Sequence, residues 1–140
     1  MANVIRNHVA GRVRSLLRLE GLVLLVASVV LYAQLGAGWG WFAALFLVPD
    51  VSLAGYLFGP ELGAVVYNTG HSTTGPLLLA VVGLLAGLPQ VLPYALIWTA
   101  HIGFDRALGY GLKYRTGFGH THLGLIGRQH AAAAAAAARA

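Results

Sequence analysis

Hydrophobic residues run almost without interruption through most of the chain, and polar residues gather mainly towards its ends. A helix that crosses a membrane needs about 20 mainly apolar residues. Four stretches meet this need or come close to it. They are residues 16–35, 39–58, 61–88, and a last one from residue 89 or 91 to about 108. The pattern predicts an all-α fold, an integral membrane bundle of about four transmembrane helices.

The third stretch is the least uniform. Its first half, ELGAVVYNTGHSTTG, contains several polar residues, whereas its second half, PLLLAVVGLLAGL, is purely apolar and too short to span alone. Pro76 lies where the halves meet. Because proline lacks a backbone N–H and clashes with the preceding turn, we expect the third helix to be kinked or broken there.

Composition supports one transmembrane domain, residues 1–130, followed by an alanine-rich tail, residues 131–140. Hydrophobic residues make up 58% of the 140 positions and charged residues 9%. Soluble domains carry about a quarter charged residues, so both a water-soluble globule and a disordered chain are excluded. The absence of cysteine excludes disulfides and thiolate metal sites. The tail favours a helix by propensity but has no face to bury.

Basic residues set the expected orientation. They are Arg6, Arg12, Arg14 and Arg18 before the first span, and Arg106, Lys113, Arg115 and Arg128 after the fourth. The connections at 36–38 and 87–89 contain none. Because basic residues favour the cytoplasmic side, we expect an inner-membrane protein of the cell with both termini cytoplasmic. The net charge of +5, placed beside the spans, favours membrane lipids over nucleic acid as a partner.

Polar side chains of all four expected spans fall in the cytoplasmic half of the bilayer. They are Glu20 in the first span, Asp50 in the second, Asn68 and His71 in the third, and His101 and Asp105 in the fourth. A charged group in hydrocarbon is costly and is by default a candidate for function. This agreement in depth predicts a single polar centre.

Histidine and carboxylate are ligands for divalent metals, and three protein ligands with one open position are typical of catalytic zinc. His101 and Asp105 are four residues apart and share a helix face. We therefore interpret four side chains as metal ligands, with zinc the first choice. These are His71, His101, Asp105 and His122, and Asp50 is an alternative to Asp105 as the carboxylate ligand. His120 alternates with His122, so only one of the two need face the bundle.

Catalytic roles are assigned to the remaining polar residues of the centre. Glu20 or Asp50 would act as the general base, and Asn68 or a tyrosine would stabilise an oxyanion. Structural roles compete with each assignment. Glu20 can pair with a nearby cation, Asp50 can cap a helix broken after Pro49, and Asn68 can join two helices.

Three functions fit this centre. The leading prediction is a metal-dependent intramembrane hydrolase of a lipid or amphiphile. A transporter of ions, protons or small molecules would use the same acids and histidines. The outer half of the spans is almost purely apolar, which favours a site open to one side only. A lipid-binding structural membrane protein is the third alternative, and the sequence leaves a homo-oligomer open.

Two segments resemble a known family. They are PDVSLAGYLFGPELGAVVYNTGHSTTGP at 49–76 and LIWTAHIGFDRALGYGLKYRTGFGHTHLG at 96–124. Both resemble small bacterial membrane proteins of the domain-of-unknown-function family 4260, and the resemblance extends from about Glu20 to Gly127. It implies a multi-span helical membrane protein but no particular reaction. It also places seven residues at the family's polar motif positions: Glu20, Asp50, Asn68, His71, His101, Asp105 and His122.

Overall fold

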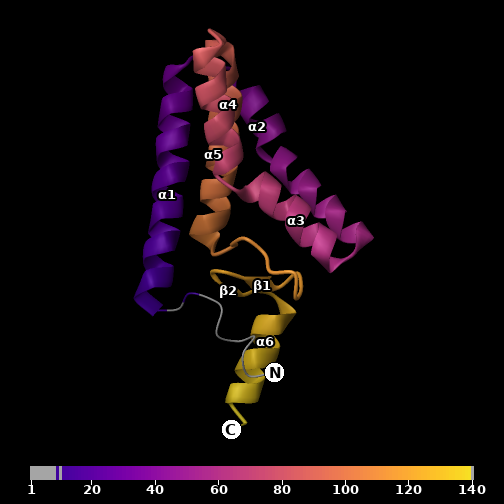
Figure 1. Ribbon diagram of the computed structural model, residues 1–140. Helices are drawn as coiled ribbons and strands as arrows, with labels where there is room; N and C mark the ends of the chain where they lie inside the picture. The colour runs from indigo at the N-terminus through magenta and orange to yellow at the C-terminus, as the bar shows by residue number, and fades with distance from the viewer. Residues whose placement is uncertain (1–8, 10, 140) are drawn as a thin grey trace.

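The computed structural model describes residues 9 and 11–139, and its fold is all-α, as predicted. Its helices are α1 (Gly11–Gln34), α2 (Trp39–Phe46), the 3-10 helix η2 (Val48–Phe58), α3 (Pro60–His71), α4 (Thr74–Leu85), the short 3-10 helix η3 (Pro89–Val91), α5 (Leu92–Leu108) and α6 (Arg128–Ala137). In Figure 1, α1, α4 and α5 stand together, and α2, η2 and α3 form a tilted hairpin beside them.

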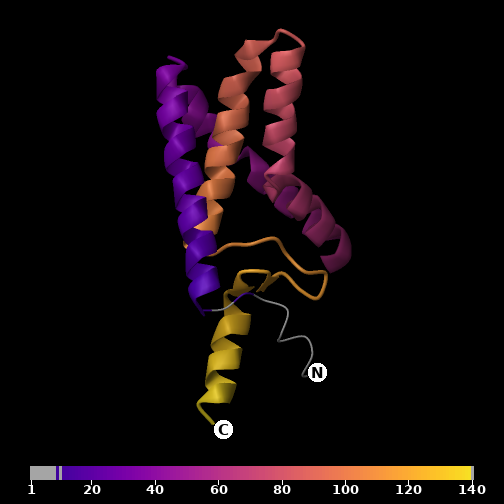
Figure 2. The same cartoon turned by 60° about the vertical axis from the view of Figure 1, so that its left-hand side comes forward.

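Two glycines bring α1 and α5 into close contact. A Cβ atom placed on Gly21 would lie 2.8 Å from the backbone nitrogen of Ala107, and one placed on Gly103 would lie 2.6 Å from that of Leu25. Small residues let two helix backbones approach closely, as is common in membrane bundles. Figure 2 shows the two helices running alongside each other, so the polar face of α5 is held at a fixed distance from α1.

The hairpin of η2 and α3 depends on the tight winding of the 3-10 helix. With three residues per turn, Pro49, Ser52 and Gly55 fall on one face. Gly55 packs against Val66 of α3, and Ser52 lies against Gly70. The sequence predicts one span over 39–58, with a helix broken after Pro49 as an alternative. The helix changes winding at Val48, just before a proline that cannot donate a backbone hydrogen bond.

The third predicted span is broken, as Pro76 led us to expect. The helix α3 ends at His71, and α4 begins at Thr74 with Pro76 in its first turn. Ser72 spans the break, because its hydroxyl accepts a hydrogen bond from the backbone N–H of Thr74 at 3.2 Å. The break leaves carbonyl groups at the end of α3 without helical partners, and side chains of α5 bond two of them.

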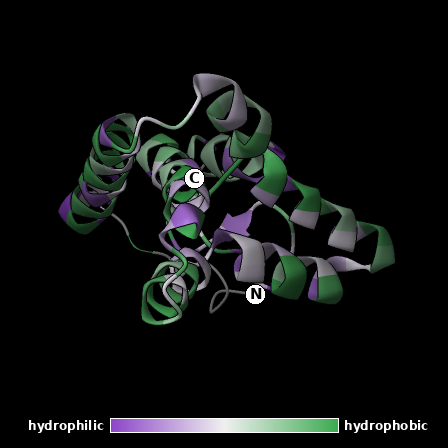
Figure 3. Cartoon of the chain, turned by 90° about the horizontal axis from the view of Figure 1, so that it is seen from above, coloured by the Kyte–Doolittle hydropathy of each residue, from purple (hydrophilic) through white to green (hydrophobic). Residues whose placement is uncertain are grey.

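Two helical stretches, Gly11–Gln34 and Trp39–Phe58, are long and apolar enough to cross a membrane. Within the most apolar part of Gly11–Gln34, only 17% is buried by the rest of the protein. The corresponding value for Trp39–Phe58 is 6%. Seen from above, the helices are predominantly hydrophobic (Figure 3). The 12 residues of α4 are apolar but too few to span alone. Four complete spans therefore remain a prediction, as does the orientation of the termini. Arg6, one of the residues behind that orientation, lies outside the described residues.

The segment after α5 folds beneath the bundle. Two short antiparallel strands, β1 (His120–Thr121) and β2 (Gly124–Leu125), form a hairpin that the sequence did not predict. The backbone of Val9 also joins it, donating to the carbonyl oxygen of His122 at 2.8 Å. The alanine-rich tail forms most of α6, which lies below the hairpin with its alanines exposed (Figure 1).

Candidate metal centre

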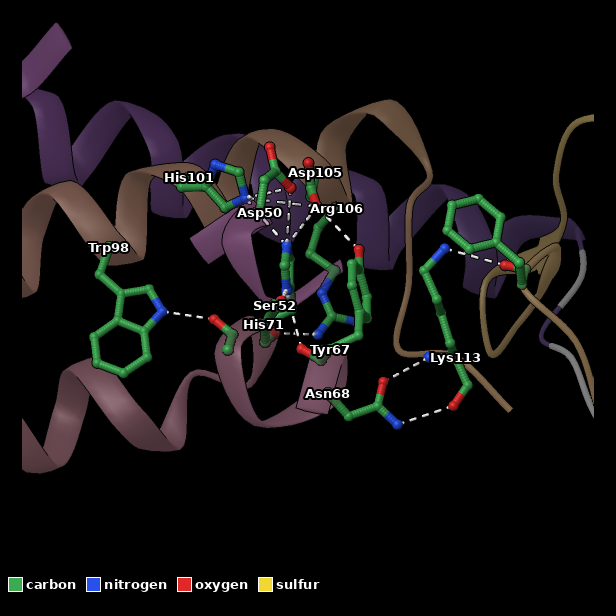
Figure 4. Close-up of polar contacts among 12 residues, drawn as sticks. Asp50, Ser52, Tyr67, Asn68, His71, Trp98, His101, Asp105, Arg106 and Lys113 are labelled. Carbon is green, nitrogen blue, oxygen red and sulfur yellow. Dashed lines mark hydrogen bonds and ion pairs between the residues drawn. The ribbon is translucent and has the colours of Figure 1, made fainter. Parts of the chain in front are cut away.

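Four side chains converge where the tilted hairpin meets α5. Asp50 comes from the first turn of η2, and His71 is the last residue of α3. His101 and Asp105 lie one turn apart on α5. Figure 4 shows the four pointing toward one another, and we call them the metal group. Among residues 9 and 11–139, this is the one set of at least three His, Cys, Asp or Glu side chains close enough to share an ion.

The spacing within the metal group matches that of a metal's ligands. The Nε2 atom of His71 lies 3.2 Å from Nε2 of His101, 3.4 Å from a carboxylate oxygen of Asp50 and 3.5 Å from one of Asp105. From His101 Nε2, the same two oxygens lie at 3.6 and 3.9 Å. Tetrahedral zinc ligands are about 3.3–3.6 Å apart when each is 2.0–2.2 Å from the ion. These residues could therefore hold a divalent ion.

Hydrogen bonds fix the tautomer of His71. Its Nδ1 atom lies 3.0 Å from the carbonyl oxygen of Tyr67, which can only accept, so Nδ1 carries the hydrogen. The Nε2 atom then presents a free lone pair to the other three side chains. The ring also stacks on the ring of Tyr67, with centroids 3.8 Å apart. A backbone carbonyl that orients an imidazole in this way is typical of histidines that bind metals.

The other three members are held differently. Asp105 accepts a hydrogen bond from the hydroxyl of Tyr67 at 3.2 Å. His101 packs edge-on against Phe46, and its Nδ1 has no hydrogen-bond partner among the described residues. The side chain of Asp50 is 39% exposed, against 15% for that of Asp105. Asp50 therefore stands on the accessible side of the metal group.

The structure does not bring Glu20 and Asn68 into the metal group. Glu20 is exposed on α1. The side-chain amide of Asn68 bonds the backbone of Lys113 twice, donating to its carbonyl at 2.9 Å and accepting from its N–H at 2.7 Å. Both polar atoms of Asn68 are thus committed to holding the segment after α5. The catalytic roles of these two residues remain predictions without support from this geometry.

His122 also lies outside the metal group, next to Arg106. Its Nδ1 accepts the backbone N–H of Leu112 at 2.9 Å, and its Nε2 lies 2.9 Å from the guanidinium of Arg106. Arg106 also donates to the carbonyl of His71 at 3.1 Å. Burial, together with the charge of Arg106, lowers the pKa of His122 and keeps it neutral. The Leu112 N–H occupies the one acceptor nitrogen of the neutral ring, so the arrangement does not present His122 as a fourth ligand.

Lys113 is a buried cation, although the sequence predicts it at the cytoplasmic surface among the basic residues that set orientation. Its ammonium lies 3.5 Å from the ring centroid of Phe118 and 4.6 Å from that of Tyr67, and it donates to the carbonyl of Phe118 at 3.0 Å. Burial lowers the pKa of Lys113 to about 8. Together with Asn68, Arg106 and His122, Lys113 fastens the segment after α5, and we call these four residues the loop clamp.

Sequence reasoning missed Ser52 as part of the site, and it left open whether Tyr67 donates to a polar site or lies at an interface. Tyr67 lies one helical turn before His71, a spacing that places the two on one face. The sequence therefore contained a signal for it. Ser52 Oγ lies 3.4 Å from Nδ1 of His71 only because η2 is wound as a 3-10 helix, which the hydrophobic pattern does not reveal.

Residues 14–126 match the model of the family described as domain of unknown function DUF4260. The match covers most of the chain, so the protein belongs to this family, in agreement with the resemblance of its sequence. No curated protein and no solved structure matches the chain.

Proposed function

For this member of the DUF4260 family, we propose that the metal group is the catalytic centre of a metal-dependent intramembrane hydrolase. The observation that carries the proposal is the convergence of two imidazole nitrogens and two carboxylate oxygens within 4.8 Å of one another. Zinc is the first choice of ion, because two histidines and a carboxylate form a common catalytic zinc site. Sodium or potassium would not favour imidazole ligands.

Within the metal group we assign different roles to the two carboxylates. His71, His101 and Asp105 are the more buried members and act as the three protein ligands. Asp50 is the most exposed member, so it can meet a substrate and a water molecule. Asp50 is accordingly the general base. Its accessibility favours it over Glu20, which lies outside the group.

The reaction is hydrolysis of an ester or amide. A divalent ion held by His71, His101 and Asp105 would polarise the carbonyl group and lower the pKa of a nearby water molecule. Asp50 accepts a proton from that water as its oxygen bonds to the carbonyl carbon. The bond from carbon to the leaving oxygen or nitrogen then breaks, and Asp50 returns the proton to the leaving group. The products are a carboxylic acid and an alcohol or amine, so atoms and charge balance.

We place this centre in the cytoplasmic half of the inner membrane, with membrane lipids as its surroundings and a lipid or amphiphile as its substrate. Large apolar side chains exposed on α1, η2 and α4 support a membrane location. The substrate would enter from the cytoplasmic leaflet, and both termini would face the cytoplasm.

The test measures bound metal and hydrolysis on the same purified protein. Wild type grown with ample zinc, iron and manganese should contain stoichiometric metal and hydrolyse p-nitrophenyl dodecanoate in micelles. Asp50→Asn should keep its metal but lower kcat by about 10²–10⁴-fold. The matched control is Glu61→Gln, an exposed acid in the first turn of α3, which should leave kcat unchanged.

Absence of stoichiometric metal in wild type would overturn the proposal and favour a structural, lipid-binding role. An undiminished kcat in Asp50→Asn would overturn the assignment of the base. A loss of activity in Glu20→Gln in its place would transfer that role to Glu20.

A further inference from the structure

An apolar cavity of about 370 Å³ lies beside the metal group, between the tilted hairpin and α4 and α5. Most of its lining is hydrophobic: Leu45, Val48, Leu79, Tyr94, Ile97 and Trp98. Val48 is 52% exposed and Tyr94 48% exposed, so the cavity opens on the outer surface of the helices. That surface is the one the proposed function places in lipid.

Part of the cavity wall adjoins the metal group. This part is formed by Pro49, Ser52 and Gly70, and Ser52 Oγ lies 3.4 Å from Nδ1 of His71. Pro49 precedes Asp50, and Gly70 precedes His71. Ile97 lies four residues before His101, so the face of α5 that carries His101 and Asp105 continues into the wall of the cavity. One face of α5 thus contributes both to the metal group and to the wall of the apolar cavity.

Trp98 is a fixed wall of this cavity. Its indole N–H donates to the carbonyl of Gly70 at 2.6 Å, one of the carbonyls left free where α3 ends. The ring lies so close to Gly75 that a Cβ atom there would be 2.7 Å from Cζ2 of the indole. The position of the ring is therefore set by backbone on both sides, and Trp98 can report what enters the cavity.

We infer that this cavity holds the hydrocarbon chain of a substrate that is a single-chain fatty acyl ester or amide, with its carbonyl group at the metal group. The inference rests on the proposed function. Its support is the apolar lining, the opening to the lipid-facing surface and the adjoining carboxylates and imidazoles. The volume lies near the lower end of the range for small-molecule pockets, about 300–1,000 Å³, and suits one chain.

A second apolar groove provides a contrast within the same molecule. It measures about 460 Å³ and is lined by residues of α1, α4, α5 and the link between α3 and α4. No residue of η2 or α3 lines it, so it does not adjoin Asp50 or His71. Leu77 faces this groove and Leu79 faces the cavity, and both belong to α4. They form a matched pair for substitution.

Quenching of Trp98 fluorescence by 9,10-dibromostearate in phosphatidylcholine vesicles tests chain binding directly. The full chain with Trp39→Phe and Trp41→Phe leaves Trp98 as the single tryptophan. Quenching should saturate as dibromostearate is added. Leu79→Phe should raise the half-saturating concentration by about tenfold or more, because the larger ring fills the cavity. Leu77→Phe should leave it unchanged.

Quenching that rises without saturation, equally in both variants, would reflect partition into the bilayer and overturn the inference. Hydrolysis gives an independent readout, because Leu79→Phe should raise KM for the dodecanoate ester far more than for the butyrate ester. Metal content separates this inference from the proposed function. Saturable quenching in a protein without metal supports the chain site and overturns the hydrolase, whereas bound metal and hydrolysis without saturable quenching overturn the chain site alone.

Discussion

The metal group and the loop clamp are neighbouring polar clusters with opposite composition. In the loop clamp, each side chain contacts backbone: Asn68 and Lys113 bond to carbonyls, Arg106 reaches the carbonyl of His71, and His122 accepts a backbone N–H. In the metal group, carboxylates and imidazoles mostly face one another. A polar side chain that bonds backbone has a structural role, whereas the converging imidazoles and carboxylates of the metal group could hold a cation. The loop clamp therefore has a structural role, whereas the metal group is the candidate for chemistry.

The largest expected effect contrasts a histidine from each cluster. His101→Ala should lower the affinity for zinc by more than about 100-fold, because it removes a direct ligand. His122→Ala should leave zinc affinity within about twofold of wild type, since His122 contacts Arg106. Competition with a chromogenic chelator measures both constants. Equal losses in the two variants would place His122 among the ligands and erase the distinction.

Asn68→Ala tests whether the loop clamp contributes to stability and not to metal binding. It leaves the backbone N–H and carbonyl of Lys113 without their partners, which should lower the free energy of unfolding by about 1–3 kcal/mol. Zinc stoichiometry should not change. Thr69→Ala is the control, because the hydroxyl of Thr69 bonds a carbonyl within its own helix and is exposed. Denaturant unfolding in micelles gives both values. Lost zinc with unaltered stability would mean that Asn68 serves the metal group.

Tyr67 touches both clusters and sharpens the boundary between them. Tyr67→Phe keeps the ring that stacks on His71 but removes the hydroxyl that bonds Asp105. Loss of a partner that orients a ligand should weaken zinc binding by about tenfold. The same chelator competition measures it, with Tyr110→Phe, an exposed tyrosine after α5, as the control. No change in affinity would show that Asp105 needs no such support.

The last comparison concerns the charge of Lys113. Its pKa is about 8 in the folded chain, against a usual 10.5. Between these values the unfolded chain binds a proton that the folded chain does not, so stability should rise with pH across this interval. The slope should be at most about 1.4 kcal/mol per pH unit. Lys113→Met should abolish this rise. Unfolding measured at several pH values tests it, and a falling curve in wild type would contradict a buried cation.

The convergence of the metal group was predictable in part from sequence. His71, His101 and Asp105 were assigned as ligands because an acid or histidine in an apolar helix is costly. Their helical spacing then placed His101 and Asp105 on one face. Asp50 was assigned to the same centre as a base, and the structure sets its oxygen beside both histidines. The same argument also assigned Glu20 and Asn68 to this centre, and the structure leaves both outside the metal group.

Other features could not be read from the pattern of apolar residues. The pattern of apolar residues does not distinguish a 3-10 helix from an α-helix over η2. The contact between Ser52 and His71, which depends on the 3-10 winding, could therefore not be predicted. His122 lies in a glycine-rich segment, where spacing does not determine direction. Its pairing with Arg106 depends on the turn after α5, in which Gly109 has a φ of 96°. In a helix the spacing of residues in the sequence determines which side chains share a face, whereas in an irregular segment it does not.

The division of ligands between two bodies has a mechanical consequence. The ligand His71 belongs to the tilted hairpin, whereas the ligands His101 and Asp105 belong to α5 of the upright bundle. An ion bound by these three side chains would join the two bodies, and its loss would remove that link. Because metal binding is coupled to the folding of its ligands, the angle of the hairpin would then depend on the supply of the ion.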